Sequence, residues 1–391
     1  MYNYLSIIKL YVRYLKKDTE HFCKFLAVIN NLLYDLYMNN TCIDTKKENK
    51  KKTLIIISLV LLVIIMFFVC LFIGSANMSL KESFMALAKK STNANNRIIW
   101  NIRFPRVLAA VIAGAGLAVA GHIMQTSLNN VMASPSTLGV SNAAVFGANL
   151  SIIGFAGGFL TMGKNMADVV STFNPFAVSG IAFAFSIISV LMILGFCKIK
   201  NFSPNTVVLA GIAIGSIWTA ATTILQFYAT DVGLSAAVIW SFGDLGRATY
   251  KQDFIMLGVV VASIIMFVIL SWRFNAMLSG DNVAKSVGVR VDLLRFIALL
   301  TSSLITAVCV SFLGIIGFVG IICPHVVKKL IGHNHTVSIP TTALAGSLLL
   351  LIADTLSRSI GNGSALPVGA ITALLGAPFF LVLLFSKKER A

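Results

Sequence analysis

The sequence predicts an all-α integral membrane protein of about ten transmembrane helices, with both termini in the cytoplasm. Hydrophobic residues make up 57% of the 391 residues, and charged residues only 12%. A soluble domain carries about 25% charged residues. The apolar residues also gather in runs of roughly 20, the length at which a helix crosses the hydrocarbon core of a bilayer. The basic residues behind the net charge of +17 lie mainly between these runs, which argues for a membrane protein and against nucleic-acid binding.

Residues 1–52 differ in composition from the rest and are expected to form a cytoplasmic or interfacial extension. They open with "MYNYLSIIKLYVRYLKK", a mixture of aromatic, aliphatic and basic residues that could lie as an amphipathic helix on a membrane surface. The segment lacks the small-residue cleavage site of a signal peptide. An equally open interpretation is that translation begins at Met38. In either case the basic cluster at 46–52 is expected in the cytoplasm.

Residues 53–388 form the predicted membrane domain. Its spans cover residues 53–73, 105–127, 138–155, 176–197, 206–229, 254–272, 296–316, 318–331, 339–358 and 366–386. Glycines recur at close-approach spacing within several spans, for example at Gly114, Gly116 and Gly121. Small residues let helix backbones approach closely in a membrane, so we expect these glycines to serve helix packing.

The distribution of positive charge favours one orientation. With an even number of spans and a cytoplasmic N-terminus, sixteen Lys and Arg residues fall on the cytoplasmic side and about ten on the outer side. Positive charge prefers the cytoplasmic side of short loops. Six of the outer residues lie in the single loop 74–106, and this local excess requires an explanation of its own.

The predicted spans contain almost no ionisable residues. Asp354 is the main exception, and Arg358 one turn later is placed to pair with it. Proton- and sodium-driven transporters bury several ionisable groups near the midplane. The sequence also lacks a P-loop and an HExxH motif, and none of its six cysteines forms a CxxC pair. We therefore expect the chain to depend on a partner for energy or to act as a passive pore. A secondary transporter working alone and a membrane enzyme are the competing classes.

Six segments, in order along the chain, resemble the permease subunits of ABC importers for iron chelates and cobalamin. They are "RFPRVLAAVIAGAGLAVAGHIMQTSLNNVMASPSTLGVSNAA" at 103–144, "VVLAGIAIGSIWTAATTIL" at 207–225, "WSFGDLGRATY" at 240–250, "GFVGIICPHVVKKLIGHNH" at 317–335, "LAGSLLLLIADTLSR" at 344–358 and "LPVGAITALLGAPFFLVLL" at 366–384. The resemblance runs from about residue 54 to 388 and leaves only the N-terminal extension uncovered. It implies a helical bundle like that of the cobalamin-importer permease.

The resemblance also implies a function and a set of partners. Ferric siderophore is the expected cargo, with cobalamin and haem as alternatives. Two permeases, identical or related, pair around a central path in the bacterial cytoplasmic membrane. Two cytoplasmic ATPases below carry ATP and Mg, so no cofactor is expected in this chain. An extracytoplasmic substrate-binding protein or lipoprotein docks above.

By resemblance, the positive charge of the outer loop serves docking. Arg103 and Arg106 match two arginines that receive glutamates of the binding protein in family members, with Phe104 where leucine is usual. Arg358 matches a third such position. Pro105 fixes a helix start between the first two arginines. The alternative is that Arg103 and Arg106 only anchor the second span at the lipid headgroups.

Residues 279–296, "SGDNVAKSVGVRVDLLRF", are expected to contact the ATPase. The segment is predicted to form two short helices, "DNVAKSV" and "VDLLRF", around Gly288. Asp281 can cap the first helix, and Gly288 suits a left-handed turn at its end. By resemblance, such a segment seats in a groove of the ATPase. The contact residues would be Gly280, Asp281, Ala284, Gly288 and Leu293. The alternative is an ordinary interfacial loop.

The translocation path is assigned by resemblance to the fifth span and its outer continuation. The lining residues would be Gly211, Gly215, Thr222, Gln226 and Tyr228. The last three could present polar groups to a passing chelate. A lining with few charges suits a bulky cargo that must leave quickly.

Pro324 and His325 are expected to mark a bend in the short eighth span. Proline removes one helix hydrogen bond and bends the chain, and His325 would then satisfy the freed carbonyls or neighbouring loops. A metal site made of Cys323, His325, His333 and His335 is not expected. His333 and His335 are expected in a cytoplasmic loop.

Overall fold

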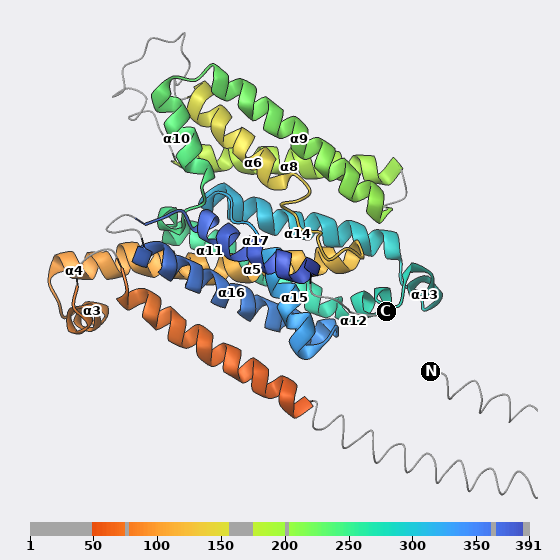
Figure 1. Ribbon diagram of the computed structural model, residues 1–391, viewed down its shortest axis with the longest axis horizontal. Coiled ribbons are helices and arrows are strands. Elements are labelled where there is room, and N and C mark those ends of the chain that lie inside the picture. The colour runs from red at the N-terminus through yellow and green to blue at the C-terminus, as the bar shows by residue number, and fades with distance from the viewer. Residues whose placement is uncertain (1–48, 75–77, 156–174, 200–202, 361–364, 386–391) are drawn as a thin grey trace, which may run out of the picture. The chain divides into compact units, whose positions relative to one another are not determined.

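The computed structural model describes residues 49–74, 78–155, 175–199, 203–360 and 365–385. The chain divides into two compact units, Met1–Ile56 and Ile57–Ala391. Only residues 49–56 of the first unit belong to the described part, so the amphipathic helix predicted near the N-terminus lies outside it. Each described element is a helix (Figure 1), which confirms the all-α prediction for these residues.

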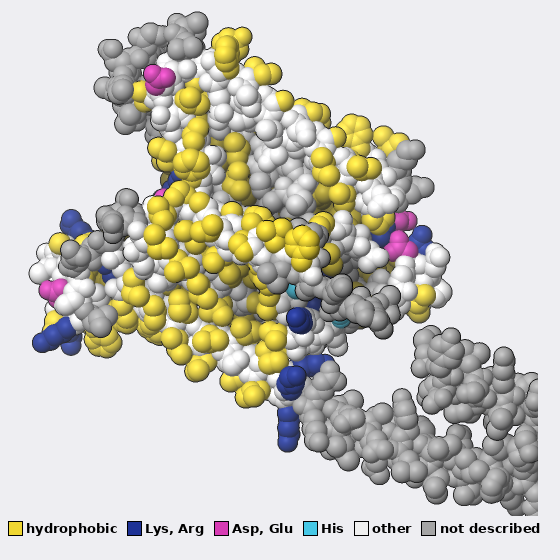
Figure 2. All heavy atoms as spheres, in the orientation of Figure 1, with side chains coloured by type: hydrophobic (Ala, Val, Ile, Leu, Met, Phe, Trp, Pro, Cys, Tyr) yellow, Lys and Arg dark blue, Asp and Glu magenta, His cyan; other side chains and the backbone are white. Residues whose placement is uncertain are grey.

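Seven of the described helices are long and apolar enough to cross a membrane. They are Asn49–Phe72, Asn93–Ser127, α8 (Pro175–Ile199), α9 (Pro204–Phe227), α11 (Tyr250–Ile269), α14 (Val291–Leu313) and α16 (His335–Ile360). Each coincides with a predicted span. Figure 2 shows hydrophobic side chains over much of the face that α16, α17 and the first of these helices present, as expected for a surface in contact with lipid.

The three other predicted spans contain shorter helices. These are α6 (Val140–Asn149) with the π-helical η2 (Leu150–Phe155), then α15 (Val319–Ile331), and α17 (Val368–Phe385). A total of ten spans and the cytoplasmic termini therefore remain predictions.

The second predicted span begins earlier than its proline suggests. Helical structure starts with α4 (Asn93–Arg97), passes through the π-helical η1 (Ile98–Arg103) and continues as α5 (Phe104–Ser127). Pro105 lies in the first turn of α5. Our prediction that it starts the helix is wrong, because the wider π turn connects α4 to α5 without a break. A π turn of this kind often lies at a functional position.

Helix α5 is the central element and packs against α11, α14, α15 and α16 (Figure 1). The backbones come closest where Gly114 meets Gly346 of α16 and where Gly121 meets Gly320 of α15. A Cβ atom added at Gly121 would lie 2.5 Å from the Cα of Gly320, closer than real atoms approach. These contacts confirm the packing role predicted for Gly114 and Gly121.

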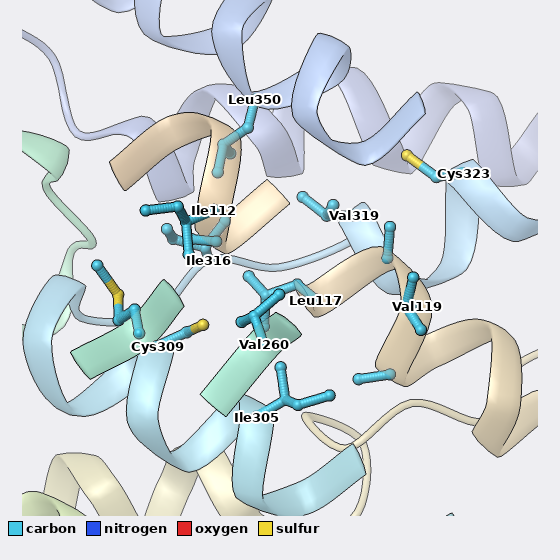
Figure 3. Close-up of a cluster of buried hydrophobic side chains, with 14 of the residues drawn as sticks. Ile112, Leu117, Val119, Val260, Ile305, Cys309, Ile316, Val319, Cys323 and Leu350 are labelled. Carbon is cyan, nitrogen blue, oxygen red and sulfur yellow. The ribbon is translucent and has the colours of Figure 1, made fainter. Parts of the chain in front are cut away.

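Around these crossings, α5 contributes to a buried hydrophobic cluster with the four helices that surround it (Figure 3). The labelled members are Ile112, Leu117, Val119, Val260, Ile305, Cys309, Ile316, Val319, Cys323 and Leu350. Both cysteines are at most 2% exposed and behave as small apolar side chains, as predicted.

Several short helices connect the spans. On one side of the bundle lie α3 (Leu80–Leu87), α10 (Asp231–Ser241) and the 3-10 turn η3 (Leu245–Arg247), and on the other lie α12 (Ser271–Met277) and α13 (Asp281–Ser286) (Figure 1). Helices α3, α10 and α12 were not predicted, since each is too short to give a distinct apolar run.

Candidate functional site

A buried charge network joins α5 to α16. The Nε atom of Arg106 donates a hydrogen bond to Asp354 Oδ1 at 2.7 Å, and Arg358 Nη2 lies 2.7 Å from Asp354 Oδ2. Asp354 is fully buried, and both arginines are less than 10% exposed. The predicted pairing of Asp354 with Arg358 is therefore confirmed. One carboxylate stabilises two buried guanidinium groups, so the loss of that carboxylate would leave them without their shared counter-charge.

Arginine side chains also cap the first transmembrane helix. The carbonyl groups of residues 70–73 lie at its C-terminus, where the last carbonyls lack partners within the helix. Arg103 Nη1 donates to two of them at 2.9 and 3.0 Å, and Arg358 Nη1 donates to the other two at 2.9 and 2.6 Å. The docking residues predicted by resemblance are thus buried and hydrogen-bonded within the chain. Their role in docking stays a prediction.

The outer segment before α11, residues 240–249, contacts the same charge network through Asp244. Asp244 Oδ1 lies 3.8 Å from Arg106 Nη1 and accepts a hydrogen bond from the backbone of Gly246 at 2.8 Å. Arg247 donates to the carbonyl groups of Trp240 and Ile239 at 2.8 and 2.6 Å. Burial lowers the pKa of Arg247, and the nearby carboxylate of Asp244 opposes that shift. These contacts of Asp244 and Arg247 were not predicted, because Arg106 is remote from Asp244 in the sequence.

The predicted ATPase-contact segment folds differently from expectation in two respects. Helix α13 is present, but its N-cap is Gly280, and Asp281 makes no capping hydrogen bond. The second predicted helix, "VDLLRF", is not separate, because Val291 already begins the long helix α14. Gly288 has φ +85°, so the left-handed turn between α13 and α14 is confirmed.

Asp281 instead forms an ion pair with a buried arginine. Both of its carboxylate oxygens accept hydrogen bonds from Arg295 Nη2 at 3.0 Å. Arg295, only 3% exposed, also donates from Nε to the carbonyl of Ser127 at 2.7 Å. The last residue of α5 is thereby linked through α14 to the start of α13. The role of Arg295 was not predicted, because its position 14 residues after Asp281 gives no local pairing signal.

Helix α13 has one buried side and one exposed side in the described part of the chain. Ala284 is fully buried against the bundle, whereas Val283 and Val287 are 50% and 58% exposed. Leu293, at the start of α14, is 48% exposed. Val283 and Val287 lie one turn apart, and exposed apolar side chains that lie together are typical of a protein contact.

A hollow of about 540 Å³ lies between α6, α9 and the loop before α6. Its lining consists of Ser136, Thr137, Gly139, Asn142, Gly211, Ile212, Gly215, Ser216, Thr219 and Ala220. Asn142 Nδ2 donates to the carbonyl of Gly215 and to Thr219 Oγ1, both at 3.2 Å. These described lining residues are uncharged and expose hydroxyl, amide and backbone groups.

Two of the five residues predicted to line the translocation path lie at this hollow. Gly211 and Gly215 line the hollow. Thr222 does not, because it is 7% exposed and donates to the carbonyl of Trp218 on its own helix. Gln226 donates to Asn149 Oδ1 at 2.9 Å. Tyr228 lies at the C-terminal end of α9 and is 55% exposed. Asn142 was not predicted as a lining residue, because a polar residue within a largely apolar helix gives no distinct signal in the sequence.

Pro324 lies inside α15, as predicted, and the ring of His325 is 6.1 Å from that of Phe379. The prediction that His335 lies in a loop is wrong. It begins α16 and is fully buried, and its Nδ1 and Nε2 atoms contact Asn275 Oδ1 and Thr126 Oγ1 at 2.8 and 2.9 Å. Within the described ranges, no three His, Cys, Asp or Glu side chains are grouped so that they could hold a metal ion.

Comparison with known proteins identifies clear relatives. The FecCD transport family matches residues 61–386. The chain is 44% identical to a protein of Methanocaldococcus jannaschii described as an ABC transporter permease, over 82% of this chain and 90% of that one. It is 34% identical to the hemin transport system permease protein of Yersinia pestis, over 82% and 94% of the two chains. It is 31% identical to the iron(3+)-hydroxamate import system permease protein of Bacillus subtilis, over 81% and 92%.

A solved structure has the same fold. It is a metal-chelate type ABC transporter in an inward-facing conformation, with a TM-score of 0.72 and 26% sequence identity. The match covers 85% of this chain and 99% of the other.

Proposed function

The chain belongs to the FecCD transport family, and from this premise we propose that it is the permease subunit of an ABC importer that passes ferric siderophore into the cell. It is a multi-pass protein of the cytoplasmic membrane. In this proposal the chain carries out transport, and ATP hydrolysis belongs to a partner. Cobalamin and haem are alternative cargoes, and a stand-alone secondary transporter is the competing class.

The observation that carries the proposal is the anchored connector α13. It lies between two glycines with positive φ, Gly280 at +101° and Gly288 at +85°. Its exposed side carries Val283 among polar residues, and its first residue, Asp281, is held to α14 and α5 by Arg295. A secondary transporter needs no such element, whereas a permease moved by an ATPase needs a rigid contact through which force can reach the spans.

The hollow along α9 supports the choice of a bulky, weakly held cargo. Its described lining is uncharged, so a chelate that enters would form only replaceable hydrogen bonds with groups such as Asn142 and Thr219. Weak binding allows rapid exit, which transport requires. Because the hollow is open on one side, a second permease, identical or related, would complete the path. Specificity would then reside mainly in a substrate-binding protein outside the membrane.

Among the candidate cargoes, we favour ferric siderophore because one relative is an iron(3+)-hydroxamate import permease. The hemin permease is comparably similar, so the choice of cargo needs a direct test. The permease would be reconstituted in liposomes with an ATPase and a substrate-binding protein encoded beside it. Uptake of radiolabelled ferric hydroxamate, haem and cobalamin would be compared.

We expect ATP-dependent uptake of the ferric hydroxamate above that of the other two. Preferential uptake of haem or cobalamin would contradict the choice of cargo but leave the permease assignment intact. Uptake by liposomes that contain this chain alone, without ATP, would contradict the permease assignment and favour the secondary transporter.

A further inference from the structure

The positive charge of the loop 74–106 is only partly used by the structure described above. Two of its six basic residues, Arg103 and Arg106, are buried in the charge network. The other four are exposed and lie on or beside α3 and α4. They are Lys81, Lys89, Lys90 and Arg97. Figure 2 shows basic and hydrophobic side chains together at this end of the molecule. The contacts described above account for Arg103 and Arg106 but not for these four exposed cations.

Helix α3 presents an apolar face that the described chain does not cover. The helix is well defined at its start, because Ser79 and Glu82 form a reciprocal capping box. Its inner face buries Ser83 and Ala86 completely, whereas Phe84 and Met85 are 67% and 41% exposed. Phe84 and Met85 are neighbours in this eight-residue helix, and exposed apolar side chains that lie together are typical of a contact surface.

The apolar face of α3 continues the lipid-facing surface of the first transmembrane helix. The ring of Phe84 lies 6.5 Å from that of Phe72, the last residue of the helix Asn49–Phe72. Only 11% of the most apolar window of that helix is buried in the structure, so most of its side chains would face lipid. An apolar surface that begins on a lipid-facing helix and extends onto α3 favours lipid over an acidic protein as its partner.

The aromatic residues near α3 indicate how deep this helix would lie in a membrane. Trp100 stacks on Phe104 with ring centroids 5.1 Å apart, and Tyr250 donates a hydrogen bond to the carbonyl of Trp100. Trp and Tyr concentrate at the boundary between hydrocarbon and headgroups. The Nζ atom of Lys89 lies 5.2 Å from the centre of the Trp100 ring. In a bilayer whose boundary lies at these rings, Lys89 would be within reach of the lipid phosphates.

We propose that α3 is an interfacial anchor that binds anionic phospholipid. Phe84 and Met85 insert beneath the headgroups, and the exposed cations Lys81, Lys89, Lys90 and Arg97 contact lipid phosphates. Amphipathic helices bind membranes through this combination of buried apolar area and attraction to anionic headgroups. The assignment to the outer leaflet rests on the orientation in the proposed function, but the lipid contact itself does not.

The first test replaces Phe84 with the photo-reactive amino acid benzoylphenylalanine in the full-length chain. The protein is placed in nanodiscs of phosphatidylcholine and phosphatidylglycerol, irradiated, and its adducts identified by mass. The same probe at Asn282, an exposed residue of α13 on the other side of the bundle, serves as the control position. We expect lipid adducts at position 84 and several-fold fewer at position 282. Equal yields at the two positions would overturn the anchor. Adducts at position 84 with an added substrate-binding protein in place of lipid would instead make α3 a protein-docking surface.

The second test measures the charge contribution. The probe at position 84 is combined with Lys81→Gln, Lys89→Gln, Lys90→Gln and Arg97→Gln, and the ratio of phosphatidylglycerol to phosphatidylcholine adducts is determined. We expect a several-fold excess of phosphatidylglycerol in the parent, falling toward the ratio of the two lipids in the nanodisc in the neutralised variant. Lys285→Gln with Arg290→Gln, two exposed cations beside α13, should leave the ratio unchanged. An unchanged ratio in the four-residue variant would refute binding of anionic lipid by these cations.

Discussion

Arg295 holds Asp281 and the end of α5 at the same time. Its Nη2 atom lies 3.0 Å from both carboxylate oxygens of Asp281, and its Nε atom donates to the carbonyl of Ser127 at 2.7 Å. The connector α13 and the central helix α5 are thus joined by one buried guanidinium. In the proposed permease, movement imposed on α13 by an ATPase would reach α5 directly through this side chain.

We predict that Arg295→Lys uncouples ATP hydrolysis from transport. Lysine keeps the charge but cannot bind a carboxylate and a carbonyl with one planar group. Uptake by the reconstituted transporter should fall at least tenfold, while ATPase activity should stay near the parent value. Asp281→Asn, which leaves Arg295 its bond to Ser127, should have a smaller effect. Loss of uptake and ATPase activity in equal proportion would point to misfolding and would contradict a role in coupling.

We predict that Asp354→Asn strongly destabilises the fold. The substitution leaves Arg106 and Arg358 buried without their shared counter-charge, and removal of one member of a buried ion pair costs about 3–5 kcal/mol. The thermal midpoint in nanodiscs should fall clearly.

The matched control is Asp244→Asn. The Asp244 side chain is 40% exposed and lies 3.8 Å from Arg106. An exposed pair contributes about 1 kcal/mol or less. Similar midpoints for the two variants would refute the central position of Asp354 in the network.

We predict that Gly121→Ala impairs folding. The added Cβ would overlap the backbone of Gly320, which cannot move as a flexible side chain could. Overpacking of a close contact costs typically about 1–3 kcal/mol. Gly180→Ala is the control, because a Cβ at Gly180 in α8 meets no described atom within 4 Å. The yield of folded protein and its thermal midpoint should fall only for Gly121→Ala, and equal values would count against the backbone contact.

The docking prediction can be tested together with the structural role of the same arginines. Arg103→Glu combined with Arg106→Glu should lower uptake, since it reverses the charge offered to a binding protein. The thermal midpoint should fall as well, because Arg103 caps the first helix and Arg106 pairs with Asp354. Loss of uptake at an unchanged midpoint would mean that the two side chains serve docking alone. Unchanged uptake would contradict the docking prediction.

The hydrophobic pattern predicted the helices of this protein well where burial in lipid decides the structure. The predicted span at 176–197 is α8 (Pro175–Ile199), and that at 206–229 is α9 (Pro204–Phe227). Gly288 was also predictable, because a left-handed turn has a strong residue preference. Short helices such as α10 and α12 were not, since a run of fewer than 12 residues carries too little periodicity.

Hydropathy and local motifs are properties of neighbouring residues, so the class of molecule, the positions of its long helices and its family could be read from the sequence. The partners of its buried charges could not, and they became known only from the packing of the helices. Arg103 caps the first helix, a role that was not predicted, Asp281 was predicted to cap α13 but binds Arg295, and His335 was predicted in a loop but is buried. The physical reason is that a buried charge must find its counterpart in space, and the helices that supply these counterparts are far apart in the chain.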